Sequence, residues 1–228
     1  MQIVELFGLP GAGKTTLVSG LSLPPGTIQR EDLARGRSAL SAVQLVRLAL
    51  ATLADWRWLG ALAVLAWQTP IRHSEALGRL LRFAVFKTWM RQQGLLLVLD
   101  QGPIQALWSI FFTEGSTRLP RGALARVIDL LYADISVVVF EIAVQPDLAA
   151  TRITSREAGN SRLDGLPFGL THSRLEACAD LPGELLAAVR QAGITVHSLS
   201  GDKTREQLRH EVQAMVDRAA ATAFKRPD

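Results

Sequence analysis

A glycine-rich segment near the N-terminus contains the residues with the clearest chemical potential. The stretch GLPGAGKTT matches the spacing G-x-x-x-x-G-K-[ST] and lies between an apolar stretch and a helix-period stretch. Glycines at these positions let successive backbone N–H groups turn toward one anion, and the positive end of the next helix dipole adds to them. We therefore predict a loop that binds a nucleoside triphosphate. The residues expected to bind it are Gly8, Gly11, Ala12, Gly13, Lys14, Thr15 and Thr16.

Three side chains are expected to do chemistry at this loop. Lys14 would neutralise charge on the transferred phosphoryl group, and the Thr15 hydroxyl would bind Mg²⁺. Asp100 ends an apolar run, and the carboxyl ends of parallel strands meet at one edge of a sheet. We expect Asp100 either to hold the Mg²⁺ through water or to accept a proton as a general base. The alternative is an aspartate that only caps the next helix.

Three arginines come after the fourth apolar run, in and before a polar, glycine-containing stretch. Arg152 and Arg156 are four residues apart and share one helix face, and Arg162 lies in the polar stretch itself. Guanidinium groups on a closing loop supply positive charge to a transition state and exclude water. We interpret residues 152–171 as a catalytic lid. The alternative is a solvated arginine face without a role.

The acceptor of the phosphoryl group is expected to bind to the long segment 30–93 and to the residue after Asp100. Acidic side chains there would bind hydroxyl groups, whereas arginines would bind phosphate or carboxylate, so the chemistry of the acceptor stays open. His73 is a candidate base, although a histidine beside a helix start more often makes an ordinary hydrogen bond. The predicted acceptor residues are Asp32, Arg35, Arg72, His73 and Gln101.

These residues can meet only if a parallel sheet positions them. Five apolar runs of strand length alternate with helix-period segments, which predicts a three-layer α/β/α sandwich with a mainly parallel five-stranded sheet, in one domain spanning residues 1–228. The predicted strands are Gln2–Phe7, Gly26–Gln29, Leu95–Leu99, Ile135–Glu141 and Ile194–Leu199. The predicted helices are Lys14–Leu21, Ser38–Gln68, Ile71–Gln92, Gln105–Thr113, Arg121–Tyr132, Asp147–Glu157, Ser173–Gln191 and Thr204–Ala221.

Residues 39–68 are the most apolar part of the chain. The longest uncharged run there, Trp58–Ile71, is shorter than a membrane-spanning helix requires. Polar residues form only a narrow stripe on this helix, so we expect most of it to be buried in the core. The alternatives are a homodimer face, a peripheral membrane contact and a contact with an apolar substrate.

Composition excludes several classes of protein. With 48% hydrophobic and 20% charged residues, the chain can bury a large core, so disorder over most of its length is excluded. The net charge of +4 is spread along the chain, with no basic tail, and we expect no binding to nucleic acid. A single cysteine, Cys178, cannot form an internal disulfide, which predicts a cytoplasmic protein.

The order of these features resembles that of P-loop nucleoside and nucleotide kinases, thymidylate kinase in particular. The sequences GLPGAGKTT and LLLVLDQG carry the resemblance, together with the arginines of the lid. It implies transfer of the γ-phosphoryl group of ATP, with Mg²⁺, to a small acceptor such as a nucleoside, nucleotide or sugar. In those families an arginine that helps hold the acceptor commonly follows the strand-end acid, whereas this chain has Gln101. The chain is also similar to uncharacterised P-loop proteins of bacterial surface-polysaccharide gene clusters, which have no established substrate.

Two other functions would use the same loop. A switch or assembly NTPase would hydrolyse the nucleotide and dock a partner or a membrane through residues 39–68. A nucleotide-binding scaffold would bind without turnover, although intact Lys14, Thr15 and Asp100 argue against it. The sequence lacks the N-K-x-D motif with which common GTPases recognise their base. The lid arginines favour the kinase over the switch, whereas the long apolar helix would favour the switch or a membrane partner.

Overall fold

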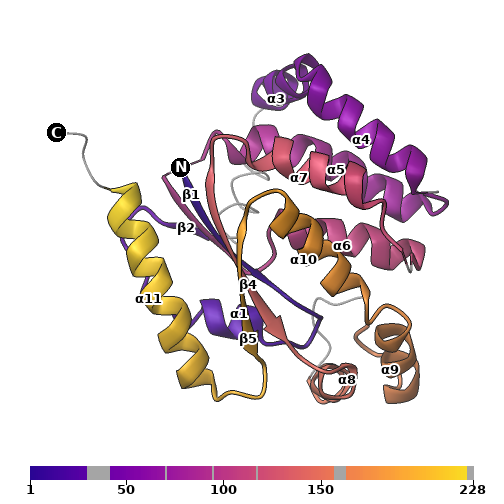
Figure 1. Cartoon of the computed structure of the whole chain (residues 1–228), viewed down its shortest axis with the longest axis vertical. Coiled ribbons are helices and arrows are strands. Elements are labelled where there is room, and N and C mark those ends of the chain that lie inside the picture. The colour runs from indigo at the N-terminus through magenta and orange to yellow at the C-terminus, as the bar shows by residue number, and fades with distance from the viewer. Residues whose placement is uncertain (30–41, 70, 94, 117, 157–162, 225–228) are drawn as a thin grey trace.

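Five parallel strands form one sheet with helices on both of its faces (Figure 1). The computed structural model describes residues 1–29, 42–69, 71–93, 95–116, 118–156 and 163–224. The strand order is β2-β3-β1-β4-β5, and every pair of neighbours is parallel. The predicted α/β/α fold class is therefore confirmed. The strands are β1 (Gln2–Phe7), β2 (Ile28–Gln29), β3 (Leu96–Leu99), β4 (Ser136–Ala143) and β5 (Thr195–Ser200).

The described helices cover the two faces of the sheet unequally. They are α1 (Lys14–Val18), α3 (Ala42–Ala54), α4 (Trp56–Gln68), α5 (Ser74–Met90), α6 (Pro103–Glu114), α7 (Arg121–Tyr132), α8 (Pro146–Thr154), α9 (Phe168–Glu176), α10 (Leu181–Gln191) and α11 (Arg205–Ala223). Alternate residues of β1 enter two separate cores: Ile3 and Phe7 pack with α4 to α7 and α10, whereas Val4 and Leu6 pack with α1 and α11. Burial on both faces explains why the strands are continuous apolar runs.

The predicted helix Ser173–Gln191 is wrong as one element, because the chain forms two. The first, α9, begins at Phe168, inside the stretch expected to be an irregular lid, and the second, α10, begins at Leu181. Pro182 lies in the first turn of α10, where its missing N–H costs nothing. A proline therefore permits this helix to start but prevents α9 from running on into it.

The predicted helix Ser38–Gln68 is also wrong as one element. Residues 38–41 lie outside the described part, and the rest divides at Asp55 into α3 and α4, whose axes are bent by 79° over Val46–Ala54 and Trp56–Gln68. Asp55 has non-helical backbone angles, φ −86° and ψ 72°, and its carboxylate accepts a hydrogen bond from the backbone N–H of Trp58 at 3.1 Å. Asp55 is thus the N-cap of α4, which ends one helix and starts the next.

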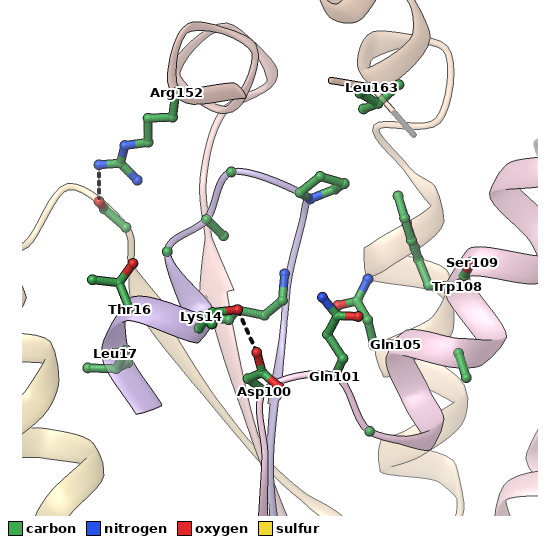
Figure 2. Close-up of a pocket in the computed structure, with 18 of the residues that line it drawn as sticks. Lys14, Thr16, Leu17, Asp100, Gln101, Gln105, Trp108, Ser109, Arg152 and Leu163 are labelled. Atoms are coloured by element: carbon green, nitrogen blue, oxygen red, sulfur yellow. Dashed lines mark hydrogen bonds between the residues drawn. The ribbon is translucent and has the colours of Figure 1, made fainter. Parts of the chain in front are cut away.

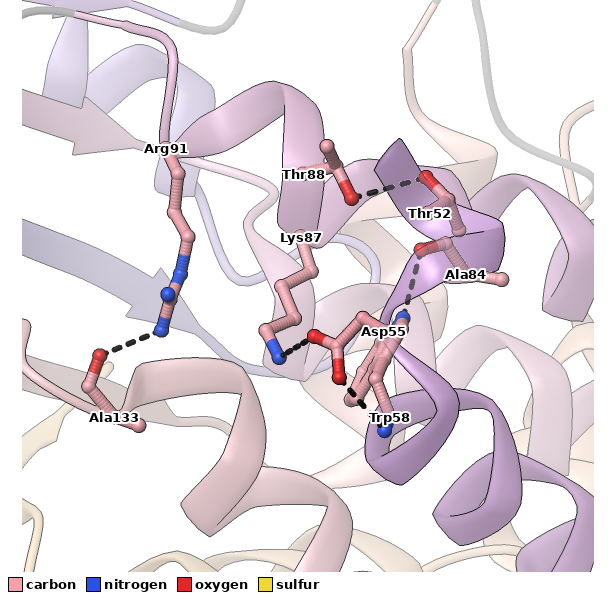
Figure 3. Close-up of polar contacts among 8 residues, drawn as sticks. All are labelled: Thr52, Asp55, Trp58, Ala84, Lys87, Thr88, Arg91 and Ala133. Carbon is pink, nitrogen blue, oxygen red and sulfur yellow. Dashed lines mark hydrogen bonds and ion pairs between the residues drawn. The ribbon is translucent and has the colours of Figure 1, made fainter. Parts of the chain in front are cut away.

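Polar contacts hold this bend against α5 (Figure 3). Asp55 forms an ion pair of 2.5 Å with Lys87, and the indole of Trp58 donates a hydrogen bond to the carbonyl of Ala84 at 2.8 Å. The side chain of Lys87 is only 7% exposed, and its ammonium group also lies over the Trp58 ring. Partial burial raises the pKa of Asp55, but the hydrogen bonds from Lys87 and the Trp58 N–H outweigh burial and lower it. The ionised pair therefore fixes where α3 ends and α4 begins.

The two helices of the bend are buried on one side only. In α4 the side chains of Trp58, Leu62 and Leu65 are buried, whereas Trp56 and Trp67 are 72% and 89% exposed. The expectation of a core helix therefore holds for the inner side alone. Among the described residues no single helix is long and apolar enough to span a membrane, and the bent pair α3 and α4 meets that test only jointly.

We predict that Asp55→Ala destabilises the fold by about 2–3 kcal/mol, because it removes the cap of α4 and leaves the buried Lys87 ammonium without its partner. Since the pKa of Asp55 is lowered, its stabilisation is present at neutral pH and is lost as the pH falls below the ordinary value of 3.8. Urea denaturation at neutral pH measures the loss. The control is Asp129→Ala, which removes an exposed pair with Arg126 and should change stability by less than about 0.5 kcal/mol. Equal losses in the two variants would contradict the prediction.

Candidate functional site

The glycine-rich loop between β1 and α1 is closely packed on α8. A Cβ atom at Gly11 would lie 2.6 Å from the carbonyl oxygen of Ala149, and Gly11 also has a left-handed φ of 83°. Gly13, the N-cap of α1, has a left-handed φ of 87° and nothing within 4 Å of a Cβ position. A side chain at Gly13 would therefore be strained and would extend into open space. The backbone of this loop, from Pro10 on, lines one end of a cleft of about 1260 Å³.

Lys14 lies inside the curve of the loop (Figure 2). Its ammonium group donates hydrogen bonds to the carbonyl oxygens of Gly8 at 2.7 Å and Leu9 at 2.9 Å, and its side chain is buried. These carbonyl partners compensate for the loss of water around a buried cation. The ammonium charge is thereby held at the floor of the cleft.

Thr15 and Asp100 meet at the same edge of the sheet, as the order of strands requires. The Thr15 hydroxyl donates a hydrogen bond of 2.5 Å to Oδ2 of Asp100, across 85 positions of sequence (Figure 2). Asp100 does not act as the cap of α6, because the first N–H groups of that helix, those of Ile104 and Gln105, donate to Glu5. The capping alternative for Asp100 is therefore not what the structure shows.

Glu5 is a fully buried carboxylate on β1, beneath the cleft. Its Oε1 accepts the backbone N–H groups of Ile104 at 2.8 Å and Gln105 at 3.1 Å, and its Oε2 accepts the hydroxyl of Tyr132 at 2.7 Å. Burial raises the pKa of Glu5 to about 7, even though these three hydrogen bonds favour the charged form. A Cβ atom at Gly102 would collide with the Glu5 carboxylate. The turn between β3 and α6 can therefore pass this close to Glu5 only with a glycine at that position.

The helix anchored by Glu5 reaches back to the glycine-rich loop. Gln105, in the first turn of α6, accepts a hydrogen bond from the backbone N–H of Gly8 at 3.3 Å through its Oε1. Glu5 therefore positions α6, and α6 positions an amide against the loop. Neither residue was predicted as part of the site, although an acid inside the apolar run Gln2–Phe7 was a usable signal: a buried charge needs nearby donors.

Helices α5 and α6 form the wall opposite the loop. The rings of Trp108 and Phe112 are stacked with centroids 4.6 Å apart, and Phe83 and Phe86 line the cleft from α5. Arg79 donates to the hydroxyl of Ser109 at 3.0 Å. The buried indole N–H of Trp108 has no hydrogen-bond partner within the part of the chain that the structure describes. This wall is thus largely apolar.

The structure separates the predicted acceptor residues. Asp32 and Arg35 lie outside the described residues, whereas Gln101 lines the cleft directly after Asp100. The backbone N–H groups of Arg72 and His73 donate, at 2.9 Å and 2.8 Å, to the glutamate that ends α6. Neither residue is among those that line the cleft. They hold the start of α5 in place.

Two of the three predicted lid arginines line the cleft. Arg152, on α8, donates to the carbonyl oxygen of Gly201 at 3.2 Å (Figure 2). Arg156 donates two hydrogen bonds, of 3.0 Å and 2.6 Å, to Oδ1 of Asp164. Arg162 lies outside the described residues. The two described arginines therefore approach the cleft from the side of the glycine-rich loop that α8 covers.

Cationic side chains outnumber carboxylates in the described lining of the cleft. In its described lining, one carboxylate, Asp100, stands against Lys14, Arg79, Arg82, Arg152, Arg156, Lys203 and Arg205. Four of these cations were not named from the sequence. Lys203 and Arg205 follow the end of β5, so the rule that ligands bind at the carboxyl ends of strands could have found them. Arg79 and Arg82 lie within α5 and have no local signal.

We predict that Glu5 makes stability depend on pH in an unusual direction. Because its folded-state pKa is raised from 4.5 to about 7, its contribution is full below pH 4.5 and is lost as the pH rises through about 7. Glu5→Gln keeps the shape of the side chain but cannot ionise. Its unfolding free energy relative to wild type should rise by about 2–3 kcal/mol between about pH 5 and about pH 8.

Urea denaturation at several pH values measures this difference. The exposed substitution Glu206→Gln, in the first turn of α11, is the control and should give a difference that is constant with pH. A constant difference for Glu5→Gln would contradict the buried, raised-pKa carboxylate.

Comparisons with known proteins find similarity among solved structures. The sequence matches no family model and no curated protein. Among solved structures, the chain is similar to deoxyadenosine kinase from M. mycoides, whose structure was described with dCMP and a flexible dCDP bound. That match has a TM-score of 0.46 and 10% sequence identity, and it covers 96% of this chain and 99% of the kinase. None of these findings bears on the resemblance to proteins of polysaccharide gene clusters.

Proposed function

We propose that the protein is a phosphotransferase that moves the γ-phosphoryl group of ATP to a small-molecule acceptor such as a nucleoside, nucleotide or sugar. The observation that carries the proposal is the cleft itself. It joins a glycine-rich loop to an aromatic wall, and its described lining has seven cationic side chains and one carboxylate. A triphosphate has several negative charges, and cations preorganised around it stabilise the charge that develops during transfer.

The residues present fit a Mg²⁺ ion. The Thr15 hydroxyl and the Asp100 carboxylate, 2.5 Å apart, are hard oxygen donors at the end of the phosphate loop. The described residues contain no cluster of three or more His, Cys, Asp or Glu side chains that could hold a metal alone. This matches the usual Mg²⁺ site, in which one or two protein oxygens act together with substrate phosphates. When bound, Mg²⁺ would supply positive charge to the β- and γ-phosphates.

The chain's own residues would then divide the work of transfer. The loop amides and Lys14 hold the triphosphate, while the wall of α5 and α6 holds the acceptor. As an acceptor hydroxyl oxygen bonds to the γ-phosphorus, the bond from that phosphorus to the bridging oxygen breaks and ADP leaves. Asp100 either takes the proton of the hydroxyl or acts through the metal site. Lys14 stabilises the charge that moves onto the leaving oxygens.

The acceptor wall favours a ligand with an apolar or planar body. Phe83, Phe86 and the stacked pair of Trp108 and Phe112 offer ring surface, and aromatic rings bind flat ligands through offset stacking. The amide of Gln101 offers hydrogen bonds that would orient it. These groups distinguish the proposal from a simple NTPase, which needs no second ligand.

The experiment that tests the proposal incubates the purified chain with Mg·ATP and separate pools of nucleosides, nucleotides and sugars. ADP release and product mass are followed together. We expect one pool to raise ADP release and to yield a product heavier by one phosphoryl group, and we expect Lys14→Ala to abolish both. ADP release that no pool raises, or that Lys14→Ala retains, would overturn the proposal; the first result would favour an NTPase switch.

Asp100→Asn is predicted to lower kcat by at least about a hundredfold, because it removes the charged carboxylate that either of its two proposed roles, proton acceptor or oxygen donor of the metal site, requires. The melting temperature should change little, since the amide still accepts the Thr15 hydroxyl. Steady-state kinetics and thermal denaturation of the same preparation measure the two quantities. A variant with normal kcat and a lowered melting temperature would assign Asp100 a structural role.

Arg156→Ala is predicted to raise the share of ATP that is lost to water. The reason is that an arginine at the cleft mouth both excludes solvent and stabilises charge on the donor. The ratio of ADP formed to acceptor phosphorylated measures this coupling. Arg126→Ala, on the exposed surface of α7, is the matched control and should leave the ratio unchanged. An unchanged ratio in Arg156→Ala would remove the lid role.

A further inference from the structure

The outward side of the α3–α4 bend is apolar and faces solvent. In α3 the exposed apolar residues follow the spacing i, i+3, i+7, i+10, so they lie on one helix face. In α4 they are spaced by eight and three residues, which also places them on one helix face. We call this surface the α3–α4 outer face; its large members are Val43, Val46, Leu50, Leu53, Trp56, Val64 and Trp67, each between 49% and 89% exposed. Exposed apolar side chains gathered on one face of each helix are candidates for an interaction site.

Charge on this surface has one sign. The exposed charged residues of α3 and α4 are Arg47 and Arg57, each at the edge of its helix's apolar arc by helical spacing. The carboxylate in this region, Asp55, is already paired with Lys87. The guanidinium group of Arg57 lies 5.5 Å from the centre of the Trp56 ring. Apolar side chains with tryptophan and flanking arginine are the pattern of a helix that lies in a membrane interface.

The inner sides of both helices are fixed to the protein. Thr52 and Thr88 share a hydrogen bond of 2.9 Å, and Trp58 and Asp55 contact α5 as described above (Figure 3). Leu48, Leu62 and other inner residues are buried in the core. An isolated interfacial helix turns a polar side to water, whereas α3 and α4 pack that side against the rest of the protein. Of the described sides of these two helices, the outer face is therefore the one that is accessible to a binding partner.

We propose that the α3–α4 outer face lies on a membrane surface that contains anionic lipids. The tryptophans and aliphatic side chains would enter the boundary between head groups and acyl chains, and the two arginines would extend to lipid phosphates. A second copy of the chain fits the face less well. A symmetric dimer through this face would bring arginines together with no exposed carboxylate of α3 or α4 to pair with them.

A membrane bound to the α3–α4 outer face would not cover the cleft. Pocket residues Arg79, Phe83 and Phe86 lie on one side of α5, whereas Ala84 and Thr88 contact the bend from another side. No described residue of α3 or α4 lines the cleft. The membrane contact is thus independent of the proposed reaction, and it can be tested without a substrate.

The tryptophans themselves provide the test. Of the 5 tryptophans, Trp58, Trp89 and Trp108 are at most 3% exposed, whereas Trp56 and Trp67 are exposed on the face. We expect their emission to shift to shorter wavelength when the full chain meets vesicles of phosphatidylcholine mixed with phosphatidylglycerol. Lipids brominated on the acyl chains should quench it. The double variant Trp56→Phe/Trp67→Phe should still sediment with the vesicles but lose the quenching.

Matched substitutions test the contribution of the face to binding. Trp67→Ser should lower the vesicle partition coefficient about tenfold, and Arg57→Gln about fivefold on anionic vesicles. Leu95→Ser, at a residue 53% exposed on another part of the surface, should leave it unchanged. Equal partitioning of all variants would overturn the proposal, as would quenching that persists in the double phenylalanine variant. Lipid-free self-association that Trp67→Ser abolishes would assign the face to a second copy instead.

Discussion

The arrangement of the site depends on one buried interaction, the Glu5 carboxylate with its three donors. A carboxylate without access to water is tolerated only where donors surround it, and here those donors come from the backbone of α6 and from Tyr132 on α7. They tie β1 to the start of α6. The turn after β3 passes directly over Glu5, where a Cβ atom at Gly102 would collide with the carboxylate, and the same turn begins at Asp100, which contacts Thr15.

A second constraint gives α5 two distinct sides. On one side the ion pair of Lys87 and Asp55 holds the α3–α4 bend, and on another side Arg79 and the phenylalanines line the cleft. Helix α5 therefore both lines the cleft and packs against the two helices that carry the α3–α4 outer face. Because an unpaired ammonium at Lys87 would be costly, the bend cannot straighten without disturbing α5.

The charge of the cleft and that of the outer face favour different ligands. In the cleft, cations converge around a glycine-rich backbone, which suits a polyanion that several groups contact at once. On the outer face, two arginines flank a broad apolar surface, and the free energy would come mainly from burial of side chains such as Trp67. A phosphotransferase with both surfaces would work beside a membrane while its cleft takes up a nucleotide.

Local features were predictable from the sequence, because they depend on neighbouring residues. The loop motif predicted a glycine-rich turn, the apolar runs predicted buried parallel strands, and the acid after Leu99 predicted a carboxylate beside Thr15. Features that join distant segments were decided by tertiary structure. The ion-pair partner of Asp55 lies 32 positions away, and the α6 N–H groups that donate to Glu5 lie 99 and 100 positions away. The acid inside the first apolar run signals that donors are needed, but nothing near it in the sequence says which segment supplies them. Which apolar residues of α3 and α4 stay exposed was decided in the same way, since burial depends on what packs against a helix and not on its own pattern.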